Sequence, residues 1–277
     1  MKPINEFMQQ TATQATSYVD RGDRAAARCA VGALRSWAVG EALLGGLTNE
    51  AANKEVIWNT AGLALAYLRV KAQALPAERA DIEVWLTALA RRVTSRYGGV
   101  AGQNNVFSWV GLVAAAVAAA TDDQVLWQES ERIHEAALRT IDAQGILPIE
   151  LQRGRRALAY HNFALVPLMV TGELRRRAGR EVSASGTEAL ERLVRFTGAM
   201  MKDSSLLADL AGSTQDDPGT RNYGVWSYIA LVRFPGVKID MRVGPEPPFD
   251  RWLGGNARFF IEDANGSDPG NSSRLLK

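Results

Sequence analysis

The sequence is short of the residues that most often build disulfides and metal sites. Its 277 residues include one cysteine, Cys29, and two histidines, His134 and His161. A single cysteine excludes an internal disulfide, and the chain shows no zinc-type cluster. We therefore expect no metal and no organic cofactor. Cys29 is expected to pack in the core of an alanine-rich helix, and His134, in a charged segment, to be solvated.

Long apolar runs and a strong net charge are also missing. The most apolar stretch, Val110 to Ala120, is too short for a membrane span. Residues 1–20 lack the pattern of a signal peptide, so the chain is either cytoplasmic or has had a leader removed. A net charge of +2 argues against a general binder of nucleic acid or membrane surfaces.

Lysine is scarce among the basic residues, with 6 lysines against 26 arginines. The planar guanidinium binds carboxylates through two hydrogen bonds, so an arginine-rich cleft suits an acidic polymer. A genome that favours arginine codons gives the same bias.

Helical periodicity dominates what the sequence does contain. With 47% hydrophobic residues and no linker, residues 1–262 read as one all-α domain, followed by a flexible tail at 263–277. Short strands are expected at 238–243 and 258–261. Turn and capping residues separate the expected helices, which cover residues 4–18, 25–44, 49–72, 77–97, 104–120, 124–141, 155–177, 187–201 and 223–232.

Apolar helices alternate with more charged ones. Those that open near Lys54, Asn104 and Gly154 start about 50 residues apart, which is one helical hairpin per repeat. Such hairpins stack into a solenoid or close into a ring.

The run from Gly145 to Val170 places charged residues and a tyrosine in an otherwise apolar helix. Arg153, Arg156 and Tyr160 follow helical spacing and are expected on one face. A guanidinium beside a phenol favours the phenolate, which makes Tyr160 a candidate proton carrier. On spacing alone, a solvated basic turn followed by an ordinary tyrosine explains the same residues.

This run, GILPIELQRGRRALAYHNFAL, resembles the GxLPxELxRGxRAxxYHxFAL pattern of the alginate lyases of polysaccharide lyase family 5. In that family the pattern carries a neutralising arginine and the catalytic tyrosine, which correspond to Arg153 and Tyr160. The resemblance covers roughly residues 5–260. It implies an incomplete α/α toroid, in which apolar inner helices surround a central cleft.

A second motif, Gln103 to Trp109 (QNNVFSW), is similar to the family's NNHxxW pattern. The resemblance implies that Asn105 binds a uronate carboxylate beside Arg153 and that Trp109 lines the cleft. Asn104 is the expected N-cap of this helix. Val106 stands where the family has a histidine, and a valine cannot donate a hydrogen bond.

Four further residues complete the expected site. Glu150 matches a family glutamate that holds the arginine or touches sugar hydroxyls. An ordinary acidic residue in the first turn of a helix explains it equally well. Trp58, like Trp109, either stacks on a sugar or packs in the core. His161 is expected to pack behind the site, although it is counted, like Arg156, with the substrate-binding residues.

These groups suit β-elimination on a uronate polymer. The C5 proton is barely acidic until donors neutralise the adjacent carboxylate, and a base and an acid must then act at C5 and O4. In mannuronate both lie on one side of the ring, so Tyr160 can serve as both.

The leading hypothesis is therefore a lyase acting on mannuronate-rich alginate or a related glucuronate-containing polymer. The alternative is a catalytically impaired relative that binds acidic polysaccharide, favoured by Val106 and by the apparent absence of the family's N-terminal lid segment. An α-helical scaffold for protein partners ranks last. A periplasmic or secreted monomer is expected from the resemblance.

Overall fold

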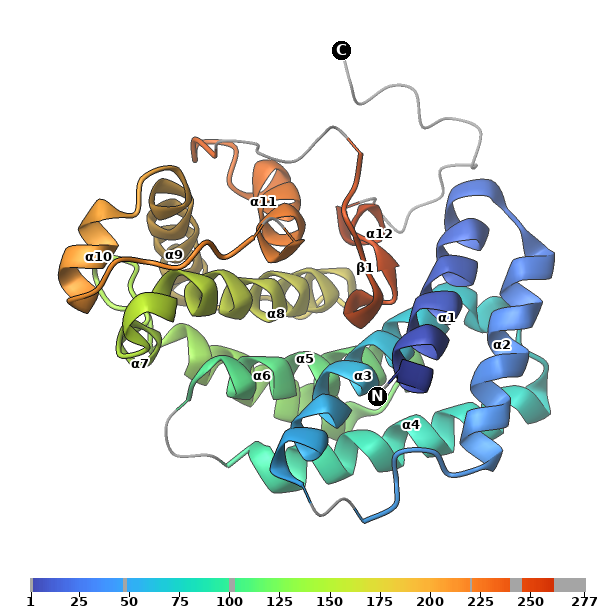
Figure 1. Ribbon diagram of the computed structural model, residues 1–277. Helices are drawn as coiled ribbons and strands as arrows, with labels where there is room; N and C mark the ends of the chain where they lie inside the picture. Colours follow the sequence, from blue (N-terminus) through green and yellow to red (C-terminus); the bar gives the residue numbers. More distant parts are fainter. Residues whose placement is uncertain (1, 47–48, 100–102, 220, 240–245, 262–277) are drawn as a thin grey trace.

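The computed structural model describes residues 2–46, 49–99, 103–219, 221–239 and 246–261, and within this part the protein is all-α, as the sequence predicted (Figure 1). Two-residue strands β1 (Phe249–Asp250) and β2 (Gly255–Asn256) form one antiparallel pair. The helices are α1 (Lys2–Arg21), α2 (Arg24–Val39), α3 (Glu50–Val70), α4 (Pro76–Tyr97), α5 (Asn105–Thr121), α6 (Gln124–Leu138), α7 (Pro148–Leu151), α8 (Ala157–Arg177), α9 (Ala184–Lys202), α10 (Ser205–Ala211), α11 (Arg221–Arg233) and α12 (Arg258–Ile261), with 3₁₀ turns η1 (Lys71–Gln73), η2 (Gly154–Arg156) and η3 (Arg251–Leu253).

Local capping chemistry sets where the helices begin. The side chain of Asn104 accepts a hydrogen bond from the backbone N of Val106, so Asn104 is the N-cap that the sequence predicted for α5. Asp23 and Asp123 cap α2 and α6 in the same way. Pro76 occupies the first turn of α4, where its missing N–H costs nothing.

The helices form two layers. α5 packs against α3 on one side and α8 on the other, and α1 and α11 extend this inner layer beyond α3 and α8. The outer helices α2, α4, α6 and α9 cover it. α5 is apolar on all sides and buried almost throughout, as expected of a helix with neighbours all round. This is the incomplete toroid that the sequence predicted.

The gap between α1 and α11 is filled by the chain's own C-terminal segment, residues 249–261. Its strand β1 and helix α12 contact α11, while η3 and β2 contact α1 and α3, and Figure 1 shows the segment in red between these helices. The strand predicted at 258–261 is wrong, because these residues form α12 and its Phe260 is buried. Lys238 and Ile239 are not in a strand either, and the rest of the predicted strand at 238–243 lies outside the described residues, as does the predicted tail.

Two single-residue predictions were also wrong. Cys29 is exposed on α2 rather than packed in the core. His134 is 2% exposed rather than solvated, because the other face of the charged helix α6 packs against α8. In the part of the chain described, no helix has the length and apolar character needed to cross a bilayer.

Candidate active site

The sequence suggested that Arg153 and Tyr160 lie on one continuous helix. In the structure a turn separates them. The chain leaves α7 at Leu151, turns at Gly154 with φ +57°, passes through η2 and enters α8 only at Ala157. A left-handed backbone of this kind favours glycine. The turn brings Arg153 back over α8, where a straight helix would have held it two turns away.

Two arginine guanidiniums lie close to the ring of Tyr160. The Cζ atom of Arg153 lies 4.9 Å from the ring centroid, and that of Arg156 lies 5.5 Å away. Tyr160 is half-buried, and Arg156 is exposed. The tyrosine therefore lies in a positively charged setting that solvent or a ligand can reach.

Glu150 connects the two motifs. Its Oε1 accepts hydrogen bonds from the backbone N of Asn105 at 2.6 Å and from Asn105 Nδ2 at 2.9 Å. Its Oε2 lies 3.4 Å from Arg153 Nε. Glu150 is 1% exposed and contacts Arg153, the first of the two contacts considered for it. A carboxylate at the first turn of α5 also suits the positive end of the helix dipole.

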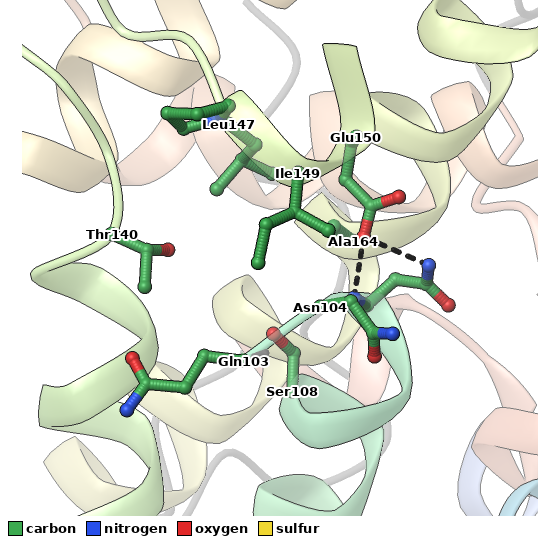
Figure 2. A pocket seen from close by; sticks show the side chains of 10 residues that line it. Gln103, Asn104, Ser108, Thr140, Leu147, Ile149, Glu150 and Ala164 are labelled. Carbon is green, nitrogen blue, oxygen red and sulfur yellow. Dashed lines mark hydrogen bonds between the residues drawn. The ribbon is translucent and has the colours of Figure 1, made fainter. Parts of the chain in front are cut away.

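A cavity of about 220 Å³ adjoins this contact (Figure 2). The dashed lines that start at the Glu150 carboxylate in Figure 2 are its two hydrogen bonds to Asn105. Tyr160 and Arg153 are not among the lining residues, so the cavity lies next to the predicted catalytic pair and does not contain it. Its walls are Gln103, Asn104, Asn105, Ser108, Thr140, Leu147, Pro148, Ile149, Glu150 and Ala164.

Trp109 does not line a cleft, which corrects the expectation from the sequence. It is 1% exposed and packs in an aromatic cluster in the inner layer, with its ring centroid 5.2 Å from Phe163. Trp58 belongs to the same cluster but is partly exposed. Trp252 of η3 completes it, stacked on Trp58 at 5.5 Å.

Phe163 and Trp252 were not predicted. Phe163 lies within the recognised motif, one turn after Tyr160. In the sequence, Trp252 is followed closely by Gly254 and Gly255, which indicates an aromatic residue on a turn. No local pattern shows that this turn packs against Trp58 and Phe163.

His161 packs behind the site, as predicted. It is fully buried, its Nε2 accepts a hydrogen bond from the backbone N of Leu147 at 3.0 Å, and its Nδ1 donates to the carbonyl of Ala157 at 2.8 Å. Burial lowers the pKa of His161 to about 4, so the ring is neutral at neutral pH. It fastens the segment before Glu150 to α8.

Val106 is half-buried in the first turn of α5 and packs against the core. Around it, the described residues contain no group of three or more His, Cys, Asp or Glu side chains placed to hold a metal. The polar groups that converge here are Asn105, Glu150, Arg153, Arg156 and Tyr160. Arg153 pairs with the buried Glu150, and both Arg153 and Arg156 lie beside the Tyr160 ring, which suits an anionic ligand next to the tyrosine hydroxyl.

Comparison with known families agrees with this chemistry, since residues 1–206 match the family model described as alginate lyase. The chain belongs to the alginate lyase family. The part matched includes both motifs. It ends before α11 and the C-terminal segment that closes the ring.

Individual alginate lyase relatives extend over more of the chain. A polysaccharide lyase of Stenotrophomonas maltophilia (strain K279a) is 35% identical over 217 residues, which is 77% of this chain and 66% of the relative, slightly under two thirds of its length. An alginate lyase of Pseudomonas putida (strain KT2440) is 32% identical over 251 residues, which is 86% of this chain and 68% of the relative.

Among solved structures, a histidine-to-alanine variant of alginate lyase A1-III complexed with a tetrasaccharide is similar, with a TM-score of 0.83 and 26% identity. The match covers 95% of this chain and 79% of that one.

Proposed function

We propose that this protein is a polysaccharide lyase that cleaves a uronate polymer by β-elimination, with mannuronate-rich alginate as its substrate. The observation that carries the proposal is the arrangement around Tyr160. Its ring lies next to Arg153 and Arg156, and the same buried carboxylate, Glu150, holds Arg153 and Asn105.

In this mechanism Asn105 and Arg153 neutralise the substrate carboxylate. Asn105 donates one amide N–H to Glu150 and has a second for the substrate. Arg153 contacts Glu150 through Nε and offers the N–H groups of its terminal nitrogens. Because both donors are fixed before substrate binds, little reorganisation is needed when negative charge develops toward the carboxylate in the transition state.

Tyr160 then moves the proton. As phenolate it removes the proton from C5, and as phenol it gives a proton to O4 as the glycosidic bond breaks, leaving a C4–C5 double bond in the product. Both atoms lie on one side of a mannuronate ring, so one hydroxyl serves both steps. The guanidiniums of Arg153 and Arg156 lie beside the ring of Tyr160 and give this step a positively charged setting.

The test is the initial rate of unsaturated-product formation, measured by ultraviolet absorbance on alginate, polymannuronate, polyguluronate, glucuronan and hyaluronan. Tyr160→Phe should abolish turnover with little loss of binding, because only the hydroxyl is removed. Tyr18→Phe is the matched control, since Tyr18 is half-buried on α1 and its hydroxyl contacts Gln73. Undiminished turnover by Tyr160→Phe would place the chemistry elsewhere.

One observation favours a second candidate, a relative that binds acidic polysaccharide without cleaving it. Val106 supplies no hydrogen bond where the family pattern has a histidine. Binding to polymannuronate without any absorbance change in the wild type would support this candidate.

The family resemblance also leads us to propose that the protein acts as a monomer in the periplasm or outside the cell. Cell fractionation and size-exclusion chromatography with light scattering test these two points.

A further inference from the structure

Gln215 lies in the segment between α10 and α11 and is half-buried against the first turn of α8. Its Oε1 accepts a hydrogen bond from the backbone N of Leu158 at 2.9 Å. Its Nε2 donates to the carbonyl of Gly154 at 3.1 Å. In Figure 1 the orange segment that leaves α10 runs along α8 toward α11. One side chain therefore binds both ends of residues 154–158, which include η2 and the start of α8.

The contact with Leu158 caps α8. The first N–H groups of a helix have no acceptor within the helix, and Arg156, at the N-cap position, supplies none from its side chain. Leu158 is 3% exposed, so water has little access to its N–H. A glutamine 57 residues later in the sequence supplies the acceptor. Because a buried N–H without an acceptor is costly, this contact helps to fix where α8 begins.

The segment that carries Gln215 is itself held in place. The Nε2 of Gln215 also donates to the carbonyl of Ser213 at 2.8 Å, and the backbone N of Ser213 donates to the carbonyl of Ala208 at 2.9 Å. Helix α10 contacts η2, α8 and α9, and its Leu207 is fully buried. Gln215 thus joins η2 and α8 to an element that is packed into the fold.

Asp216 adds a second contact with the same turn. Its backbone N donates to the carbonyl of Arg155 at 2.7 Å. Its carboxylate lies 3.4 Å from Arg155 Nε, but both side chains are exposed, and surface ion pairs contribute little to stability. The hydrogen bonds of the Gln215 side chain and of the Asp216 N–H therefore do most to fix the backbone of residues 154–158 from outside.

The residues held in this way carry the groups that the proposed reaction uses. Arg153 directly precedes Gly154, Arg156 lies within the stretch, and Tyr160 follows Leu158 on α8. The glutamine side chain binds the backbone on the arginine side at Gly154 and on the tyrosine side at Leu158. The distances of the two guanidiniums from the tyrosine ring, 4.9 Å and 5.5 Å, depend on how these two sides are placed.

We propose that Gln215 is a positioning residue for the reaction. It ties the turn that carries Arg153 and Arg156 to the end of α8 that carries Tyr160, and so keeps the two guanidiniums beside the tyrosine ring. This inference rests on the proposed function and adds to it a residue that lies outside both sequence motifs. Its effect on the reaction passes through the backbone of residues 154–158.

The test uses Gln215→Met, which keeps the length of the side chain and removes its donor and its acceptor. On polymannuronate kcat should fall about 10- to 100-fold, because displacing the reacting groups by about 1 Å costs up to about 100-fold in rate. KM should change by no more than about 3-fold, because Asn105 and Arg153 keep their contacts with Glu150.

The matched control is Gln73→Met. Gln73 is also half-buried, and its Nε2 donates to the hydroxyl of Tyr18 at 2.9 Å, a contact between η1 and α1. This variant should lower the Tm by a similar amount and leave kcat and KM unchanged. A fall in kcat of the same size in both variants would show that Gln215 acts only through stability, which would overturn the positioning role.

Hydrogen exchange measured by NMR tests the contact without any turnover. In Gln215→Met the amide of Leu158 should exchange about 10-fold faster than in the wild type, as expected for the loss of one hydrogen bond. The amide of Val166, in the middle of α8, should be unchanged. If Gln215→Met does not fold, Gln215→Glu takes its place. It keeps the acceptor for Leu158, removes the donor to Gly154 and should lower kcat with KM unchanged.

The outcomes separate this inference from the proposed function. If the wild type cleaves polymannuronate and the folded Gln215→Met, or Gln215→Glu in its place, has the wild-type kcat, the positioning role is wrong and the proposed function stands. The same holds if the Leu158 amide of Gln215→Met exchanges at the wild-type rate, since the glutamine then does not cap α8. If the wild type cleaves no uronate polymer, the proposed function fails and the positioning role fails with it.

Discussion

Glu150 accepts two hydrogen bonds from a single residue, Asn105, at 2.6 Å from its backbone N and at 2.9 Å from its side chain. Its second oxygen faces Arg153. One buried carboxylate thus fixes two groups that lie far apart in sequence and are proposed to bind the same substrate charge. Glu150 is a positioning residue in this proposal, because its buried carboxylate contacts Asn105 and Arg153.

We predict that Glu150→Gln lowers kcat/KM on polymannuronate by at least about 10-fold. Glutamine keeps one acceptor for Asn105 but turns an amide group toward Arg153, which releases the guanidinium from its position. The measurement is the initial rate of product formation, with circular dichroism to confirm the fold.

Glu173→Gln is the matched control for this variant. Glu173 is also a buried glutamate, but it contacts Arg176 and Arg233 near the far end of α8. This substitution should lower the Tm and leave kcat/KM of the remaining folded protein unchanged. Equal rate losses in the two variants would mean that Glu150 acts only through stability.

Val106→His should increase turnover if the rest of the lyase site is intact. The histidine would add a donor to the uronate carboxylate, and one preorganised donor is typically worth on the order of 100-fold in rate. The gain should appear first on mannuronate polymers and disappear when Tyr160→Phe is added. A histidine variant that folds, binds polymer and produces nothing would favour the binding-protein alternative.

Stability should fall as pH drops from neutral toward 4, because two histidines are buried in neutral form. Burial and the positive charge of Arg175 lower the pKa of His134 to about 4. Burial lowers the pKa of His161 to about 4. The Nε2–H of His134 donates to the carbonyl of Leu168, and its Nδ1 accepts from Arg175. Protonation would break the second contact.

The sign follows from proton linkage. Between pH 4 and the ordinary histidine pKa of about 6.5, the unfolded chain binds protons that the folded chain does not, so stability is complete above that range and is lost as pH falls through it. Between pH 7 and pH 5, the low pKa of each histidine should lower the free energy of unfolding by about 2 kcal/mol. Urea unfolding of wild type and His134→Gln at both pH values measures this. An equal pH dependence in the variant would contradict the assignment to His134.

Gly145→Ala should destabilise the protein by roughly 3 kcal/mol or more, because the residue has φ +85° and a Cβ would overlap the backbone of Arg192. Gly179→Ala separates these two effects, since Gly179 has φ +67° and open space around it. That variant should cost only about 1 kcal/mol. Urea unfolding compares the two, and similar losses would show that close packing at Gly145 is not important.

The sequence by itself determined the helices and both motifs. Apolar periodicity and capping residues such as Asn104 are local signals, so they predict α5 and the other long helices without knowledge of their neighbours. The motif spacing likewise brought Arg153, Tyr160 and Asn105 into one proposal, although the link between Arg153 and Tyr160 is a turn and not a helix face.

Only the tertiary structure decided which side chains are buried and what fills the centre of the ring. His134 and Cys29 exchanged their predicted environments because helix packing decides which face of a helix meets solvent. Trp252 lies beside Trp58 because Arg69 binds the turn that carries Trp252. Arg69 and Leu253 of that turn are 184 residues apart in sequence. Contacts over such separations depend on the whole chain being folded, and no local pattern of residues carries them.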